Sequence, residues 1–232
     1  GHAPGDNLEF AFEPGERVRL RFINGSAMTF FNVRIPGVPM TVIAADGQDV
    51  EEVEVDEFQI GTAETYDVIV APPAGSHAIV AESMDRSGMG VASLTSHHGH
   101  IAPPPPLREI PTLTMTDMGM MDHAAMGHDM KGMAGMDHSM RDTSLLPADV
   151  KAGPGIDMVA QSPKDRMDFP GLGLDTVEHR VLRYTDLKAK RMNPHRRVER
   201  EMEIHLTGNM ERYMWSFDGR KFTSATDQPI RL

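Results

Sequence analysis

The chain of 232 residues contains no cysteine. This absence excludes disulfide bridges, thiolate zinc sites, a cysteine nucleophile and iron–sulfur clusters. Aromatic residues make up only 6% of the chain, so a globular core is possible but is not spread evenly along it. No apolar run approaches the length that a membrane-spanning helix needs, and we therefore expect no membrane span.

Basic residues are also too few to balance the acidic ones, and the formal net charge is -11. This charge argues against nucleic acid as a partner, whereas an acidic surface raises the local concentration of cations. The chain begins with Gly1 and carries no signal peptide. We therefore expect a processed or truncated product.

What the chain does contain is a concentration of methionine and histidine in residues 115–140, MTDMGMMDHAAMGHDMKGMAGMDHSM. Nine of these 26 residues are methionine, and none is Leu, Ile, Val, Phe, Tyr or Trp. Methionine in a core packs beside aliphatic and aromatic partners, which are missing here. Thioether sulfur is a soft ligand that suits Cu(I), and imidazole also binds copper. The candidate metal ligands are Met115, Met118, Met120, Met121, His123, Met126, His128, Met130, Met133, Met136, His138 and Met140.

Short spacings within this Met-rich stretch (residues 115–140) support the metal-binding interpretation. Pairs such as Met118 and Met121, or Met133 and Met136, let two sulfurs close on one ion at a small entropic cost. The alternative is a low-complexity linker without a ligand. We favour copper or silver binding over the inert linker.

Residues 1–96 are predicted to be an all-β unit. Residues 17–22 alternate between charged and apolar side chains, which is typical of a strand with one buried face. Turn signals such as Asp46-Gly47 separate short runs without a long helical pattern, and this indicates an antiparallel sandwich. The further candidate strands are residues 29–35, 40–45, 50–60, 66–70 and 77–81.

Residues 97–177 are predicted to be a Pro/Met/His-rich linker. His97, His98 and His100 precede four prolines at positions 103–106, which form a stiff polyproline II spacer. These histidines either extend the metal-binding region or form a solvated tract. Residues 141–176 lack periodicity, and we expect them to be unstructured.

Order is expected to return at residues 178–187. Residues 201–206 alternate as in a strand, and residues 213–217 followed by Asp218-Gly219 indicate a hairpin. His205 shares a face with Glu201 and Glu203 in this pattern, so we interpret it as facing solvent rather than as a ligand. The strands up to Leu232 are too few to close a domain.

Four blocks of the sequence resemble a known family. FEPGERVRLRFIN (residues 12–24), ADGQDV (45–50) and AETYDV (63–68) resemble the middle cupredoxin domain of multicopper oxidases. Together with the Met-rich stretch, LTGNMERYMWSFDG (206–219) narrows the resemblance to the copper resistance protein A family of bacterial periplasmic oxidases.

The resemblance implies an all-β chain: a cupredoxin-like Greek-key β-sandwich, a long disordered Met-rich linker, and the start of another cupredoxin domain. Residues 1–96 would be the second of three domains, without its N-terminal strands, and residues 178–232 the first strands of the third. Copper ions and other periplasmic copper-handling proteins would be the partners. The family's blue copper site needs a Cys, and the trinuclear cluster needs paired His-x-His motifs, so no catalytic or cofactor-binding residue carries over to this chain.

Three hypotheses about function remain open at this point. In the first, the chain is a fragment of a copper-tolerance multicopper oxidase that oxidises Cu(I) or a phenol and reduces O2, with Cu(I) collected by the Met-rich stretch. In the second, the protein is not an enzyme and sequesters periplasmic copper. In the third, it is an adhesion or scaffolding domain with a low-complexity linker.

Overall fold

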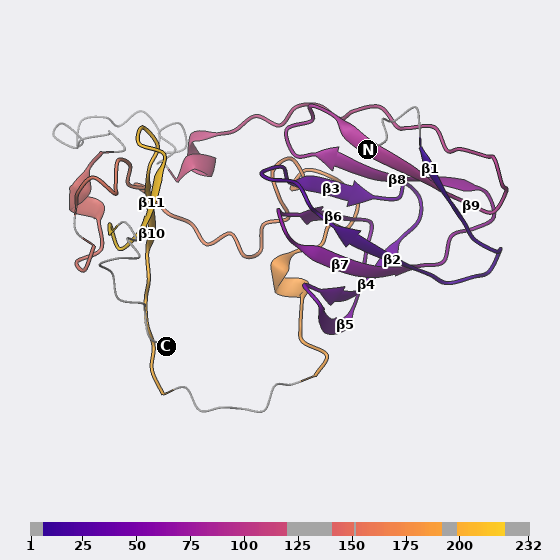
Figure 1. Ribbon diagram of the computed structural model, residues 1–232, viewed down its shortest axis with the longest axis horizontal. Helices are drawn as coiled ribbons and strands as arrows, with labels where there is room; N and C mark the ends of the chain where they lie inside the picture. Colours follow the sequence, from indigo (N-terminus) through magenta and orange to yellow (C-terminus); the bar gives the residue numbers. More distant parts are fainter. Residues whose placement is uncertain (1–6, 120–140, 151, 192–198, 221–232) are drawn as a thin grey trace. The chain divides into compact units, whose positions relative to one another are not determined.

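The computed structural model describes residues 7–119, 141–150, 152–191 and 199–220. The chain divides into two compact units, Gly1–Thr112 with Asp165–His195, and Leu113–Lys164 with Arg196–Leu232. Among the described residues the regular structure is β-strand apart from three short 3-10 helices (Figure 1). None of the helices in this part of the chain is long and apolar enough to cross a bilayer.

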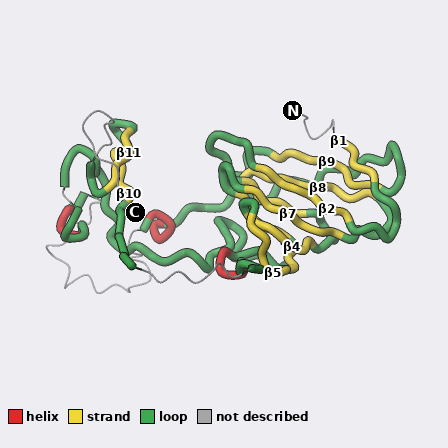
Figure 2. Tube along the Cα trace, turned by 60° about the horizontal axis from the view of Figure 1, so that its bottom comes forward, coloured by secondary structure: helices red, strands yellow, loops and turns green. Residues whose placement is uncertain are grey.

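The first unit is a sandwich of two β-sheets (Figures 1 and 2). One sheet has the strand order β1-β9-β8-β3-β6 and the other β2-β7-β4-β5. The all-β, cupredoxin-like sandwich predicted from the sequence is confirmed. The strands are β1 (Leu8–Ala11), β2 (Val18–Ile23), β3 (Phe31–Arg34), β4 (Met40–Ala45), β5 (Gln48–Val55), β6 (Glu57–Ile60), β7 (Thr65–Val70), β8 (Ser76–Ser83) and β9 (Met89–Thr95).

Local sequence explains much of this sandwich. Strand β2 alternates as predicted, with Leu20 and Phe22 packed against the core and Arg19 and Arg21 exposed. Asp46 and Gly47 have φ of 47° and 77°, the pair of positive values that a two-residue type I′ hairpin requires. Ala45 consequently pairs with Gln48 across the turn.

Two features of the sandwich differ from the predicted antiparallel arrangement. Strand β1 pairs with β9 in parallel at the edge of the five-stranded sheet, whereas the other neighbouring strands of that sheet are antiparallel. The single run predicted for residues 50–60 is two strands, since β5 and β6 belong to different sheets. Asp56 stands between them, where the chain crosses from one layer to the other.

The core lies between the two sheets and is built around Phe58, which is fully buried. The Phe58 ring packs against Phe22 at 5.4 Å and against Tyr66 at 5.0 Å between centroids. Met40 is fully buried in the same cluster. This methionine has the aliphatic and aromatic neighbours that a core methionine requires.

Residues 97–112 and 165–191 contain no strand, but they pack against the sandwich. The Ala102 N–H donates to Ser93 Oγ at 2.9 Å. Val181 forms a parallel bridge with Glu57, and Ala189 an antiparallel bridge with Val50. Residues 178–187, where order was expected, thus pack against the sandwich, and η4 (Tyr184–Asp186) lies among them.

Among the described residues of the range 141–176, regular structure is limited to η3 (Thr143–Leu145), in line with the missing periodicity. Leu174 is nevertheless buried to 2% exposure, so part of this segment is held by packing. The domain boundaries at residues 96 and 177 stay predictions.

The second unit contains an antiparallel hairpin of β10 (Leu206–Asn209) and β11 (Met214–Phe217) (Figure 2). The strand predicted at residues 213–217 corresponds to β11, but this hairpin turns between Asn209 and Met214 and not at Asp218-Gly219 as predicted. The strand predicted at residues 201–206 was wrong, because β10 begins at Leu206. A strand needs a hydrogen-bonding neighbour, and β11 pairs with Leu206 and the three residues that follow it. Asp218 and Gly219, with φ of 50° and 75°, turn the chain back so that Phe217 bridges Arg220.

An ion-pair cluster on the four-stranded sheet generates the first prediction. Asp67 on β7 contacts Arg19 and accepts hydrogen bonds from Arg21 at 2.7 and 2.8 Å. The Arg21 guanidinium lowers the pKa of Asp67 to about 2, against the effect of burial and with help from Arg19. A lowered pKa stabilises the fold above the ordinary carboxyl pKa, and this contribution is lost as the pH falls from about 4 to about 2.

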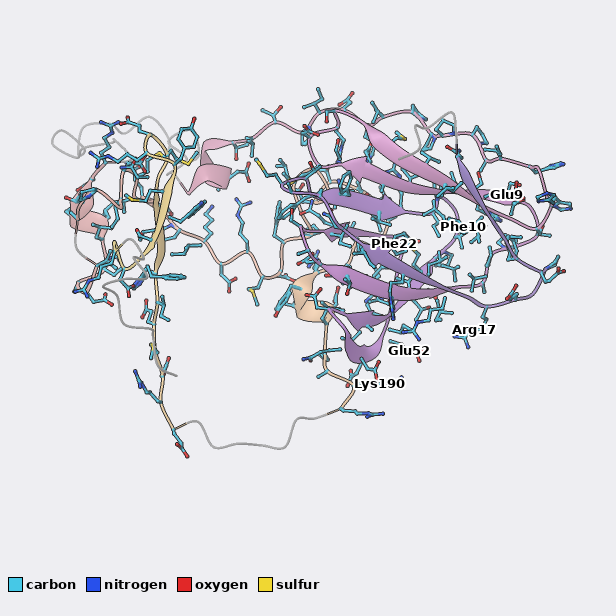
Figure 3. All side chains as sticks on the ribbon, in the orientation of Figure 1. Glu9, Phe10, Arg17, Phe22, Glu52 and Lys190 are labelled. Carbon is cyan, nitrogen blue, oxygen red and sulfur yellow. The ribbon has the colours of Figure 1, made fainter. Side chains whose placement is uncertain are left out.

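Asp67→Asn is expected to lower the free energy of unfolding at pH 7 by about 1–2 kcal/mol, a value reduced because both arginines are largely exposed. Its loss of stability between pH 4 and pH 2 should be smaller than that of the wild type. Urea unfolding at a series of pH values measures both effects. Glu52→Gln is the control, since Glu52 lies 3.7 Å from Lys190 in an exposed pair (Figure 3). Equal pH profiles for the wild type and Asp67→Asn would contradict the prediction.

Candidate metal-binding site

Most of the predicted metal ligands fall outside the described residues. Met115 and Met118 are the first and last residues of η1 (Met115–Met118). Thr114 fixes the start of this turn, because its N–H and its hydroxyl both donate to Asp117 Oδ2, at 2.8 and 2.7 Å. The predicted ligands outside the described residues are Met120, Met121, His123, Met126, His128, Met130, Met133, Met136, His138 and Met140.

The His97–His100 loop is described, and Glu9 on β1 holds it. Glu9 accepts hydrogen bonds from the Gly99 N–H at 3.1 and 3.0 Å and contacts His98 Nδ1 at 2.8 Å. The Gly99 N–H, together with His98, holds the pKa of Glu9 below its usual value although burial opposes this. The His97 and His100 rings lie 5.7 Å apart between centroids, whereas His98 is turned toward Glu9. The structure therefore does not bring the three imidazoles to one point.

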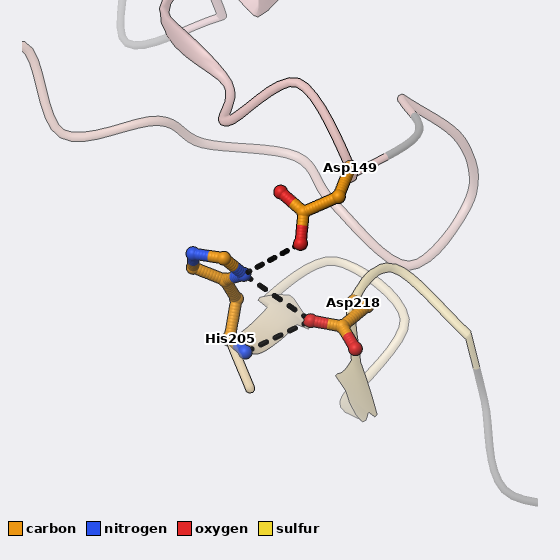
Figure 4. Close-up of side chains that lie close together, drawn as sticks. All are labelled: Asp149, His205 and Asp218. Carbon is orange, nitrogen blue, oxygen red and sulfur yellow. Dashed lines mark hydrogen bonds and ion pairs between the residues drawn. The ribbon is translucent and has the colours of Figure 1, made fainter. Parts of the chain in front are cut away.

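One group of three metal-ligating side chains occurs within the described part of the chain: Asp149, His205 and Asp218 (Figure 4). One ligand atom from each residue lies within 4.8 Å of the other two. Asp149 comes from a turn closed by the Val150 N–H and the Pro147 carbonyl. His205 precedes β10 and Asp218 follows β11, so the hairpin brings these two together.

Reciprocal hydrogen bonds fix His205 against Asp218. The His205 N–H donates to Asp218 Oδ1 at 2.9 Å, and the Asp218 N–H donates to the His205 carbonyl at 2.8 Å. His205 Nδ1 lies 3.2 Å from Asp218 Oδ1 and 4.0 Å from Asp149 Oδ2. His205 Nε2 lies 2.8 Å from Glu203 Oε1. Both imidazole nitrogens thus face carboxylates.

The electrostatics of this cluster favour a positive charge on the ring. Partial burial would lower the pKa of His205, but the Asp218 and Glu203 carboxylates outweigh it and raise that pKa above its ordinary value. The His205 N–H is the main cause that lowers the pKa of Asp218. An imidazolium satisfies every one of these contacts. One nitrogen and two carboxylate oxygens also form a donor set for a borderline or hard divalent ion, and not for soft Cu(I).

The sequence interpretation of His205 was incomplete. Its contact with Glu203 agrees with the shared face, yet the His205 side chain is only 21% exposed and belongs to the one candidate ligand group described. Antiparallel pairing of residues 206–209 with residues 214–217 is what places Asp218 beside His205, because these two residues flank the paired ends Leu206 and Phe217. Asp149 had no local signal, since it is brought in by tertiary structure.

Replacing Asp218 by asparagine is expected to lower the pKa of His205 toward the ordinary imidazole value near ~6.5. Because the pKa of His205 is raised in the fold, its ion pairs stabilise the hairpin below that ordinary value and are lost as the pH rises through the raised pKa. NMR titration of the His205 imidazole measures the shift. Asp149→Asn, with its longer 4.0 Å contact, should have a smaller effect. An unchanged titration in Asp218→Asn would refute the assignment.

The multicopper oxidase family model matches residues 1–99. Copper resistance protein A of Escherichia coli is 44% identical over 274 aligned residues, which cover 100% of this chain and 44% of that protein. A copper resistance protein A homolog of Pseudomonas syringae pv. tomato is 45% identical over 257 residues, covering 100% of this chain and 43% of that protein.

Among solved structures, the laccase from Botrytis aclada matches 45% of this chain and 21% of its own, with 27% identity and a TM-score of 0.39. A score this low adds no argument to the strand topology given above. The chain spans less than half the length of the curated relatives named here. From the match along its whole length and the domain match at residues 1–99, the chain belongs to the copper resistance protein A family of multicopper oxidases.

Proposed function

We propose that this chain is the middle part of a periplasmic copper-tolerance multicopper oxidase, and that its Met-rich stretch binds Cu(I). The intact protein would oxidise Cu(I) or a phenol and pass the electrons to O2. The single observation that carries the proposal is the composition of residues 115–140, with nine methionines and no large aliphatic or aromatic residue.

A comparison of two methionine environments supports this interpretation. Met40 is fully buried and packs in the aliphatic and aromatic core of the sandwich. The Met-rich stretch has no such partners in its own sequence, so its methionines are not explained by core packing. Thioether sulfur also carries no proton to lose and therefore keeps its affinity for Cu(I) under mildly acidic conditions.

Copper is the cofactor of the multicopper oxidase family. A blue copper site needs a cysteine thiolate with two histidines, and the chain has no cysteine. The one described group of candidate ligands has a single imidazole and two carboxylates. These residues do not fit a catalytic copper centre, so the proposed part of this chain in the reaction is to collect the ion and to space the domains that react.

The second candidate is a non-enzymatic protein that sequesters periplasmic copper, which the methionines of residues 115–140 would serve as well. The two candidates make different predictions for the intact protein. The oxidase consumes O2 as Cu(I) is supplied, whereas the sequestering protein binds Cu(I) without O2 uptake.

Replacing all nine methionines of the Met-rich stretch by leucine is expected to weaken Cu(I) binding there strongly, because leucine has similar volume and no sulfur lone pair, and only the three histidines remain as ligands. Anaerobic titration of this chain against a chromogenic Cu(I) chelator measures binding. In the intact protein, the same variant should lower the rate of Cu(I) oxidation and the copper tolerance of the host cell.

The control is a variant with four methionines elsewhere replaced by leucine, at positions that are 45–86% exposed. It should bind Cu(I) as the wild type does, because these thioethers are isolated. If the nine-leucine variant bound Cu(I) equally well, or left oxidation and tolerance unchanged at every copper concentration, the collecting role would be wrong. The control positions are Met28, Met158, Met167 and Met210.

A further inference from the structure

Two fully buried carboxylates lie on the outer face of the five-stranded sheet. Glu57 on β6 and Glu82 on β8 are both 0% exposed, and β3 lies between these strands (Figure 1). Arg34 on β3 is 2.9 Å from Glu82 and 3.8 Å from Glu57. Phe58, next to Glu57 in β6, points into the core instead. A carboxylate removed from water is costly unless it is paired and hydrogen-bonded, so this face requires partners from outside the sheet.

The first partner comes from the arm that leads toward the Met-rich stretch (residues 101–112, the outgoing arm). Arg108 binds Glu57 through both terminal nitrogens, at 3.0 and 2.7 Å. Its Nε donates to Glu82 at 2.6 Å, and its backbone N–H donates to the other oxygen of Glu82 at 2.9 Å. Burial alone would raise the pKa of Glu82, but Arg108 and Arg34 together hold it below its usual value.

The second partner comes from the arm that follows the Met-rich stretch (residues 165–191, the returning arm). His179 Nε2 lies 2.7 Å from Glu57 Oε2. The backbone of the same glutamate is paired too, because the Leu182 N–H donates to the Glu57 carbonyl at 2.9 Å. Glu57 therefore holds the returning arm through its side chain and its main chain.

The two arms also touch each other beside this network. Gly173 of the returning arm has φ of 69°, and a Cβ there would lie 3.0 Å from Pro111 and 3.3 Å from Arg86 Nη2. Arg86 is itself buried and lies 3.7 Å from Glu82. A residue larger than glycine would push the arms apart at this point.

One oxygen atom joins the two arms. Glu57 Oε2 accepts the hydrogen bond from Arg108 Nη1 and also faces His179 Nε2. We propose that Glu57 is a shared anchor that couples the two arms, so that loosening one arm loosens the other. The chain between Arg108 and His179 is then a closed loop that leaves and returns on one face of the sandwich.

His179→Gln tests the coupling through native-state hydrogen exchange of this chain. The variant keeps a donor but removes the imidazole from Glu57 Oε2. Exchange of the Leu182 amide on the returning arm should rise. If Glu57 couples the arms, exchange of the Arg108 amide on the outgoing arm should rise as well, by about threefold to tenfold, which lies within the range of couplings between residues that share one network.

The matched control is His77→Gln, because His77 lies on β8 of the same sheet, where its imidazole contacts the Pro73 carbonyl at 2.8 Å and its ring lies against Phe12. This control should leave hydrogen exchange of the Leu182 and Arg108 amides unchanged. A rise confined to residues 180–182 in His179→Gln would show that the arms are held independently, and would overturn the proposal. An equal rise in hydrogen exchange of the β7 amides would show that the variant lowers global stability, and this result would overturn the proposal too.

The reciprocal variant Arg108→Lys keeps the positive charge but loses the planar fork that binds Glu57 through two nitrogens. It should raise exchange of the Leu182 amide by a similar factor. If it raises exchange near residue 108 alone, Glu57 does not transmit between the arms. Neither variant removes a candidate copper ligand, so Cu(I) binding by the chain stays a separate measurement from the coupling.

Discussion

The structure of the first unit depends on pairing two negative charges that have been taken out of water. Glu57 and Glu82 are fully buried, and Arg34 alone does not satisfy both. The chain must therefore cross the outer face of the sheet twice, once to bring Arg108 and once to bring His179. Segments that have almost no regular secondary structure become part of the fold because they complete this charge network.

In the other polar clusters charges are also paired, but less of the charge is removed from water. Asp67 is paired with two arginines that remain largely exposed, so burial of charge there is partial. Around His205, three carboxylates share one imidazole at the surface of the hairpin unit. The donors in these clusters are thus nitrogen and oxygen, whereas nine of the 19 methionines of the chain lie in residues 115–140. Under the proposed function, copper handling belongs to the Met-rich stretch, whereas the described clusters hold the fold together.

Predictions from sequence succeeded where the signal is local. The alternation of residues 17–22 follows from one strand with one buried face, and Asp46-Gly47 determines its turn through two positive φ values. The predictions from sequence failed where a strand depends on pairing with a neighbouring strand. Residues 201–205 alternate without a strand, and residues 50–60 divide between two sheets although their composition shows no break.

The sequence by itself determined the class of the chain: short β-strands with their turns, a composition without cysteine, and a sulfur-rich stretch that packing does not explain. These properties depend on side-chain chemistry and on backbone preferences within a few residues. Tertiary structure alone decided that β1 lies parallel to β9, that Asp149 reaches His205, and that Arg108 and His179 meet on one oxygen of Glu57. Such contacts join residues far apart in the chain, and they form because buried charges and unpaired backbone groups must find partners wherever the fold supplies them.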